Sequence, residues 1–249
     1  MNLALHSRSG NKKTESLMKN IKGAEDRPLG LQITGNNELE FERFVKSGKW
    51  KDFDLIDLNC GCPSIRITGN SAGSYLLKNP DKIVQMVSIL KKTGKPVTAK
   101  IRLGFKENNV FDVARAVENA GADALTVHAR LAIHGSDVVA DWNWLKKIKK
   151  IVKIPLIGNG DVFSGKDVEK MLEICDGVMI ARGAIGDPFI FSRVLNYFKN
   201  GQEEEFDFFR NLEIFGEYLR LEKKYYGSDV DLGRVKYLGG KFLRGFCFI

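Results

Sequence analysis

The strongest constraint on the fold is an alternation of short β-rich runs with amphipathic segments between residues 29 and 200. Such an alternation is typical of parallel strands joined by helical crossovers. The pattern therefore predicts an α/β fold. The predicted strands cover residues 29–34, 53–59, 96–102, 123–128, 154–158 and 177–181.

Local signals mark where several helices begin. Asn79 is placed to cap a helix over residues 80–92, and Pro80 occupies its first turn, where a missing N–H costs nothing. Apolar residues in this segment recur at helical spacing. Further N-caps are predicted at Asp141, Ser164 and Asp187.

The number of strands limits the architecture. A closed (β/α)8 barrel needs eight strands, and before residue 29 only residues 1–5 offer strand material, followed by a helix around residues 14–21. We therefore predict a TIM (β/α)8-type barrel lacking its first strand and most of its second. After about residue 203 the alternation gives way to helical spacing. The expected domains are a catalytic barrel over 1–202 and a partial α-helical domain over 203–249.

Composition excludes several classes of protein. No apolar run approaches the roughly 20 residues of a membrane span, and the first residues lack a secretory pattern, so we expect a cytoplasmic protein without membrane association. Four scattered cysteines lack the second pair of a zinc site or a disulfide framework, and no metal is expected. The net charge of +8 favours a polyanionic partner.

Chemically capable side chains recur where the predicted strands end. Lys100 ends one strand, and His128 and Arg130 follow the next, so alternation directs these groups toward one mouth of the barrel. Cations in such a place need an anionic or electron-rich partner, which indicates ligand binding. His6 and His134 have no comparable neighbours and are assigned structural or exposed positions.

Two glycine-containing turns follow the last predicted strands. They are Gly158-Asn159-Gly160-Asp161 and Arg182-Gly183. Barrel enzymes commonly bind a phosphate at this point with backbone N–H groups. Two ordinary turns would give the same pattern, but their shared position at consecutive strand ends favours a phosphate site.

The sequence Asn59-Cys60-Gly61-Cys62-Pro63 places two thiols at a strand end. Cys62 is the candidate proton donor or nucleophile, because an ordinary thiol is mostly protonated near neutrality. Cys60 is predicted to be a small buried hydrophobe. Asn59 would then direct its amide toward the mouth, which suits recognition of a planar amide-bearing ring.

These motifs, in this order, resemble the tRNA-dihydrouridine synthase family, which are flavoprotein barrels that reduce uridine in tRNA. The resemblance spans roughly residues 29–240. It implies FMN bound by Gln32, Lys100, His128, Asn159, Gly160, Asp161, Arg182 and Gly183, and substrate contacts from Asn59, Arg66 and Arg130. Arg66 stands where the family usually has lysine.

The resemblance also implies a mechanism. Reduced FMN would deliver hydride to C6 of a flipped-out uracil, Cys62 would donate a proton to C5, and NADPH would supply the hydride. The partner would be tRNA, held in part by basic residues after residue 203. Two other hypotheses stay open: an FMN barrel oxidoreductase acting on a small pyrimidine or enone, and a catalytically inactive RNA-binding remnant.

Overall fold

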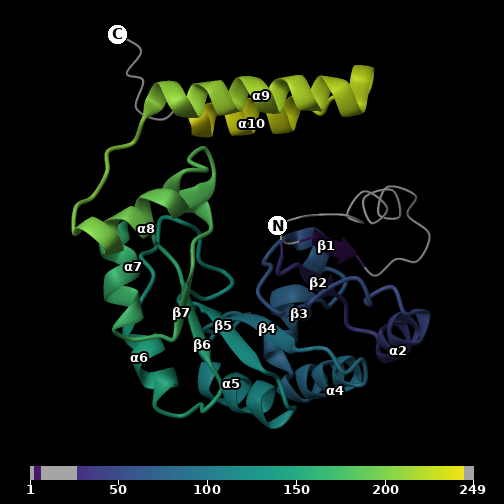
Figure 1. Ribbon diagram of the computed structural model, residues 1–249. Helices are drawn as coiled ribbons and strands as arrows, with labels where there is room; N and C mark the ends of the chain where they lie inside the picture. Colours follow the sequence, from purple (N-terminus) through teal and green to yellow (C-terminus); the bar gives the residue numbers. More distant parts are fainter. Residues whose placement is uncertain (1–2, 7–26, 244–249) are drawn as a thin grey trace. The chain divides into compact units, whose positions relative to one another are not determined.

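The computed structural model describes residues 3–6 and 27–243, and its centre is one β-sheet of seven strands (Figure 1). The strands follow one another in chain order, and the pairs from β1–β2 to β5–β6 are parallel. The six predicted strands are confirmed, and β1 overlaps residues 1–5. The strands are β1 (Leu3–His6), β2 (Gly30–Thr34), β3 (Leu55–Asn59), β4 (Val97–Arg102), β5 (Ala124–His128), β6 (Leu156–Asn159) and β7 (Gly177–Met179).

Helices connect the strands, as a parallel sheet requires. The predicted helix around residues 14–21 lies outside the described residues. The helices are α2 (Glu38–Ser47), α3 (Ile65–Thr68), α4 (Pro80–Lys91), α5 (Val110–Asn119), α6 (Asn143–Lys149), α7 (Gly165–Leu172), α8 (Ile190–Asn200), α9 (Phe208–Tyr226) and α10 (Leu232–Phe242), with 3-10 turns η1 (Gly73–Lys78), η2 (Arg182–Ala184) and η3 (Gly227–Asp229).

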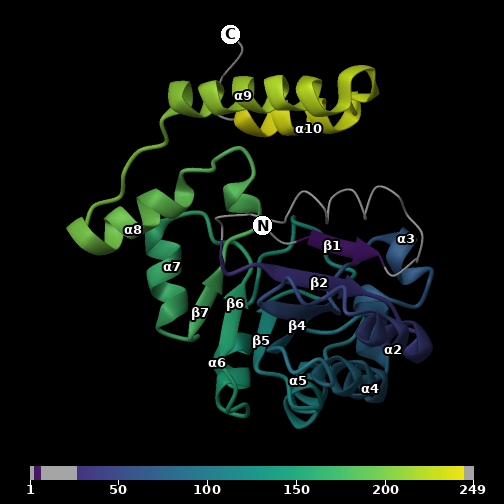
Figure 2. The ribbon, with the colours of Figure 1, turned by 45° about the vertical axis from the view of Figure 1, so that its right-hand side comes forward.

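The core follows from strict alternation within the strands. In β4, Val97, Ala99 and Ile101 are fully buried, whereas Thr98, Lys100 and Arg102 are partly exposed. Helices α4 and α5 lie side by side against the strands (Figures 1 and 2), and α4 buries its apolar side chains. One set of strand residues is therefore apolar and buried, and the intervening set is polar.

The cap predictions met different outcomes. Asn79 and Ser164 are N-caps of α4 and α7, with side chains that accept the N–H groups of Lys82 and Asp167. Asp141 was wrongly predicted as a cap, because Trp142 is the N-cap of α6 and Asp141 closes a turn by accepting the Asn143 N–H at 3.1 Å.

Asp187 was also wrongly predicted as a cap. Helix α8 begins at Ile190, and Phe189 is its N-cap. The Asp187 carboxylate instead receives both terminal nitrogens of Arg193, at 2.8 and 2.6 Å. A bidentate guanidinium is a stronger partner for a carboxylate than a single backbone N–H.

A repeated clamp joins strands at their amino-terminal ends. Three aspartates each directly precede a strand, and each accepts the N–H of a residue at the start of the neighbouring strand. In return, the aspartate N–H donates to that residue's carbonyl, and a proline precedes the residue in all three cases. The side-chain bonds are Leu29 N to Asp54 (2.6 Å), Val97 N to Asp123 (2.6 Å) and Leu156 N to Asp176 (2.8 Å).

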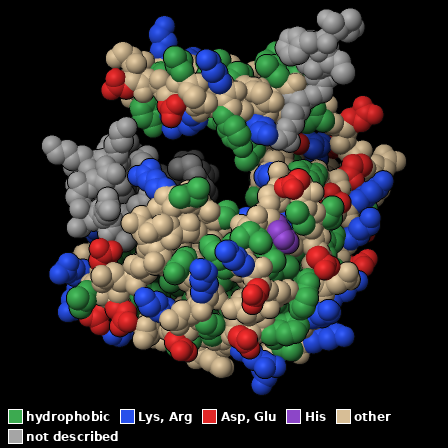
Figure 3. Space-filling view, turned by 180° about the vertical axis from the view of Figure 1, so that it is seen from behind, with side chains coloured by type: hydrophobic (Ala, Val, Ile, Leu, Met, Phe, Trp, Pro, Cys, Tyr) green, Lys and Arg blue, Asp and Glu red, His purple; other side chains and the backbone are tan. Residues whose placement is uncertain are grey.

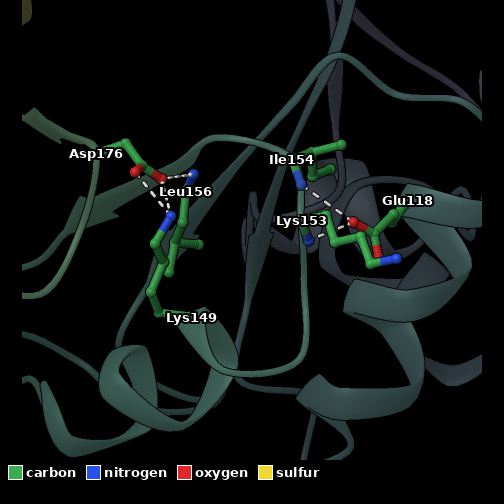
Figure 4. Close-up of polar contacts among 6 residues, drawn as sticks. All are labelled: Glu118, Lys149, Lys153, Ile154, Leu156 and Asp176. Carbon is green, nitrogen blue, oxygen red and sulfur yellow. Dashed lines mark hydrogen bonds and ion pairs between the residues drawn. The ribbon is translucent and has the colours of Figure 1, made fainter.

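Figure 4 shows the third clamp beside a related contact. Asp176 receives the Lys149 ammonium together with the Leu156 N–H, and these two donors lower the pKa of its carboxyl group. Nearby, Glu118 accepts the N–H groups of Lys153 and Ile154 at 2.5 and 3.0 Å. Carboxylates at this end of the sheet thus satisfy backbone donors that precede the strands.

The chain divides into two compact units. The first comprises Met1–Asn159 and Ile174–Val178, and the second comprises Gly160–Glu173 and Met179–Ile249. Within the second unit, α9 and α10 lie side by side, and Phe215 stacks on Phe242 with ring centroids 5.2 Å apart. The helical segment predicted after residue 203 is confirmed, whereas the domain boundary at 202/203 stays a prediction.

The described residues contain neither a membrane-spanning helix nor a cluster of possible metal ligands. Within residues 3–6 and 27–243, no helix combines the length and the apolar character needed to cross a bilayer. In the same part of the chain, no three His, Cys, Asp or Glu side chains are grouped so that they could hold a metal ion.

Candidate active site

Strand register in the first unit builds a layer of polar side chains at the carboxyl ends of β2–β6. Gln32 lies opposite Asp57, Asn59 opposite Lys100, and His128 opposite both Arg102 and Asn159. The carboxyl ends of parallel strands are where barrel enzymes place their catalytic groups. The layer brings together five site residues predicted from the sequence: Gln32, Asn59, Lys100, His128 and Asn159.

A chain of hydrogen bonds connects two of these residues, Gln32 and Asn59, with Asp57. Gln32 Nε2 donates to Asp57 Oδ2 at 2.7 Å, and Asn59 Nδ2 donates to Gln32 Oε1 at 2.8 Å. Asn59 Oδ1 then accepts the N–H groups of Gly61 and Cys62 at 3.1 and 2.9 Å. Both ends of the Asn59 amide therefore bond within the protein. Its predicted role in substrate binding stays a prediction.

The loop that carries Cys62 is held at further points. Arg102 Nε donates to the Gly61 carbonyl at 2.9 Å, and the Ser74 N–H donates to the Cys62 carbonyl at 3.0 Å. Gly73 has a φ of +61°, and a Cβ there would lie 2.8 Å from the Cys62 carbonyl oxygen. Only glycine fits this close, left-handed turn without strain. The Cys62 backbone is thus fixed from two sides of the loop.

The two cysteines differ in exposure. Cys60 is completely buried, as predicted, and burial followed by the nearby Asp57 charge raises the pKa of its thiol. Cys62 is partly exposed. A partly exposed thiol is accessible to a ligand, whereas a buried one is chemically inert.

Lys100 is one of two cations in the layer, the other being Arg102. Its Nζ donates to Asn159 Oδ1 at 3.3 Å. Burial, reinforced by the Arg102 charge, lowers the pKa of Lys100 to about 8, although Asp57 and Cys62 act in the opposite direction. A buried ammonium is suited to an anionic or carbonyl-bearing ligand.

His128 and Arg130 contact each other. Arg130 is buried, with Nη1 3.1 Å from His128 Nε2, and its Nε donates to the Val138 carbonyl. A guanidinium can only donate, so Arg130 is the donor in this contact and His128 Nε2 the acceptor. Substrate binding by Arg130 stays a prediction.

The second unit holds the other predicted phosphate-binding residues. Arg182 donates to Asp161 at 2.5 Å, and its guanidinium lies 5.7 Å from the centre of the Phe163 ring. Asp161 itself has a positive φ of 52°. A Cβ on Gly183 would lie 2.6 Å from the Val162 carbonyl oxygen, so this turn requires glycine. Gly160, the remaining predicted residue, immediately precedes Asp161.

Arg66 lies apart from the polar layer as an exposed residue of the short helix α3. Conversely, Asp57 and Arg102 were not predicted as site residues, although both belong to the layer. The sequence could have indicated Asp57 as a site residue. It is a carboxylate between Ile56 and Leu58, both buried, and it lies on the same side of the strand as Asn59. Burial raises the pKa of the Asp57 carboxyl group, against its hydrogen bonds with Thr98 and Gln32.

Comparison with known proteins identifies the family to which the chain is similar. The family model described as dihydrouridine synthase matches residues 4–237. A probable tRNA-dihydrouridine synthase of Aquifex aeolicus is 36% identical over 80% of this chain and 66% of its own length. A probable tRNA-dihydrouridine synthase of Rhizobium leguminosarum is 30% identical over 91% of this chain and 71% of its own length.

A tRNA-dihydrouridine(16) synthase of Neisseria meningitidis serogroup A is 36% identical over 73% of this chain and 56% of its own length. The chain thus spans about 56–71% of these three curated relatives. Among solved structures, a DHODH from Eimeria tenella aligns with a TM-score of 0.57 and 14% identity, over 75% of this chain and 61% of that one. That likeness concerns the fold.

Proposed function

Because the chain belongs to the dihydrouridine synthase family, we propose that it reduces uridine in tRNA to 5,6-dihydrouridine with a flavin cofactor. The observation that carries the proposal is the partly exposed Cys62, held by a fixed loop beside a layer that contains cations, amides and an imidazole. A family resemblance alone would not supply a positioned proton donor.

The donor set of the polar layer fits a flavin. Lys100 offers an ammonium, Gln32 an amide and His128 an imidazole, groups that suit the carbonyl oxygens and ring nitrogens of an isoalloxazine. We assign the ring of FMN to these three residues. We propose that Asn159, Gly160, Asp161, Arg182 and Gly183 bind the ribityl phosphate. When bound and reduced by NADPH, FMN would supply the hydride for C6 of the uracil.

The chemical role that falls to this chain's own residues is proton donation. Reduction at C6 leaves negative charge that must be quenched by a proton at C5, and the Cys62 S–H is the proposed donor. The Asn59 bond to the Cys62 N–H and the Ser74 bond to its carbonyl hold the thiol in place during that transfer.

Access to a base in tRNA requires that the nucleotide leave its stack. We propose that Arg66, Arg130 and the basic residues of α9 and α10 contact the RNA. Several cations on those helices already pair internally, including Arg220 with Glu217 and Arg234 with Glu222. Figure 3 shows basic side chains interspersed with acidic ones over one face, so the charge of +8 is not segregated there. The expected compartment is the cytoplasm, where tRNA is modified.

The first experiment is the visible absorption spectrum of the purified chain supplied with FMN, followed by a uridine-reduction assay with NADPH and unmodified tRNA. We expect a bound-flavin spectrum and tRNA-dependent turnover. Cys62→Ala should keep the flavin and lose turnover by at least about a hundredfold, whereas Cys175→Ala is the matched thiol control. Reduction of free uridine without tRNA would favour a small-substrate oxidoreductase. Salt-sensitive tRNA binding without flavin would favour an inactive RNA-binding protein.

A further inference from the structure

The hydrogen bonds that end at Cys62 form a relay whose direction is chemically fixed. A carboxylate only accepts, so Asp57 requires the Nε2 end of Gln32 to face it. Gln32 Oε1 must then face Asn59 Nδ2, which leaves Asn59 Oδ1 for the N–H groups of Gly61 and Cys62. Each amide therefore has one orientation, set at one end by a carboxylate and at the other by backbone donors.

We propose that Asp57 is a positioning residue that acts through the relay of Gln32 and Asn59 to hold the Cys62 thiol in place for proton donation. This role rests on the proposed function of Cys62. Asp57 itself does not touch the thiol loop. Its Oδ2 accepts a hydrogen bond from Gln32 Nε2 and its Oδ1 accepts one from Thr98 Oγ1, both at 2.7 Å.

A partly buried carboxylate in the middle of a strand is costly, and this cost argues for a role beyond packing. Its strand neighbours Ile56 and Leu58 are fully buried and apolar, and an apolar residue at position 57 would avoid desolvating a charge. Asp57 faces the Lys100 ammonium, which offsets part of that cost. The carboxylate thus serves two neighbouring site residues, Gln32 and Lys100.

Removing the hydrogen bond between Asp57 and Gln32 should weaken the bonds by which Asn59 holds the Cys62 loop. Without an acceptor at position 57, Gln32 Nε2 loses its partner, and the amide is free to turn away from Asn59. The N–H groups of Gly61 and Cys62 would then lose a fixed acceptor. The expected result is greater exposure of the Cys62 thiol together with poorer alignment for proton transfer.

The test measures the alkylation rate of Cys62 by iodoacetamide in the full chain without flavin or tRNA, with peptide mass spectrometry to separate the four cysteines. Asp57→Ala should raise the rate at least threefold. Asp57→Asn should stay within twofold of the wild type, because an amide oxygen can take the Gln32 bond while its NH2 donates to Thr98. Thr98→Val removes the other bond to the same carboxylate and should also stay within twofold.

Two further variants decide ambiguous cases. Gln32→Met breaks the relay one link later and should also raise the rate at least threefold, so it decides the matter if Asp57→Ala does not fold. Asp123→Asn weakens a clamp at the opposite strand end and controls for lost stability. The proposal is overturned if Asp57→Ala and Gln32→Met both remain within twofold of the wild type, or if Asp123→Asn accelerates alkylation equally.

Turnover gives an independent readout. With tRNA, Asp57→Ala should lower kcat at least tenfold and change the KM for tRNA by less than twofold. If the wild type shows no turnover, the proposed function fails, but the alkylation rates still report on the relay. An unchanged kcat in Asp57→Ala would overturn the positioning role.

Discussion

The lowered pKa of Lys100 predicts that flavin affinity falls as the pH rises from 7 to 9. The pKa of about 8 arises first from burial and then from Arg102, offset in part by Asp57 and Cys62, while Asn159 accepts a hydrogen bond from Nζ. If the flavin requires the ammonium form, the apparent Kd is the intrinsic Kd divided by the protonated fraction. That fraction is about 0.9 at pH 7 and about 0.1 at pH 9. The Kd should therefore rise about tenfold, or about 1.4 kcal/mol.

The assay is a titration of FMN fluorescence quenching between pH 6.5 and 9.5 at constant ionic strength. Lys100→Gln is the matched control, because glutamine keeps a hydrogen-bond donor at this position but does not titrate. Any pH dependence left in the Kd of this variant comes from groups other than Lys100. Its Kd should be higher than that of the wild type at pH 7 and should lack the rise centred near pH 8.

The stability of the flavin-free protein should change with pH in the opposite direction to its flavin affinity. Because the native pKa of Lys100 lies below its ordinary value of 10.5, the unfolded chain binds more protons between about pH 8 and 10.5. This group therefore makes the flavin-free protein more stable as the pH rises through that window, whereas flavin affinity falls. Equal pH slopes for the wild type and Lys100→Gln would refute the assignment of Lys100 as the titrating contact.

Three other predictions concern stability and the cysteine loop. Asp123→Ala leaves the Val97 N–H without its 2.6 Å partner and should lower the free energy of unfolding by about 1–3 kcal/mol in urea titrations, while Glu205→Ala in an exposed loop should not. Gly73→Ala should cost about 1–3 kcal/mol and lower turnover, because its left-handed φ and the nearby Cys62 carbonyl both oppose a Cβ. Ser74→Ala should leave the melting temperature unchanged or higher, because Oγ is buried without a partner; a lower value would contradict this.

Local patterns predicted the parts of the fold that local forces determine. Short β-rich runs located six strands, and the Asn79-Pro80 pair located the start of α4, because a cap is decided by residues three positions apart. Asp187 could not be judged in this way. Its carboxylate could bond either a helix N-terminus or Arg193, and the side chain of Arg193, six residues later, is the partner that it bonds.

The polar layer was only partly predictable for a similar reason. Strand ends indicated Lys100 and His128, but the partner of each was set by register between strands. Asp57 is bonded to Gln32, 25 residues earlier, and to Thr98, 41 residues later, and neither contact leaves a local pattern. The resemblance to a family named residues that are expected to contact a ligand. It gave no information about Asp57, which bonds one of those residues, Gln32.

In the segment from Asp54 to Asn59, position along the strand decides whether an aspartate has a structural role or belongs to the polar layer. Asp54 directly precedes β3, clamps the Leu29 N–H and pairs with Arg27, so its carboxylate joins two strands at their beginnings. Asp57 lies three residues later, in the middle of the strand, where alternation gives it the same side as Asn59, two residues further on. Its carboxylate therefore bonds the partners of the polar layer. Two identical side chains in one short segment thus serve opposite ends of the sheet, and exchanging Asp54 for Asn should affect unfolding while leaving Cys62 alkylation unchanged.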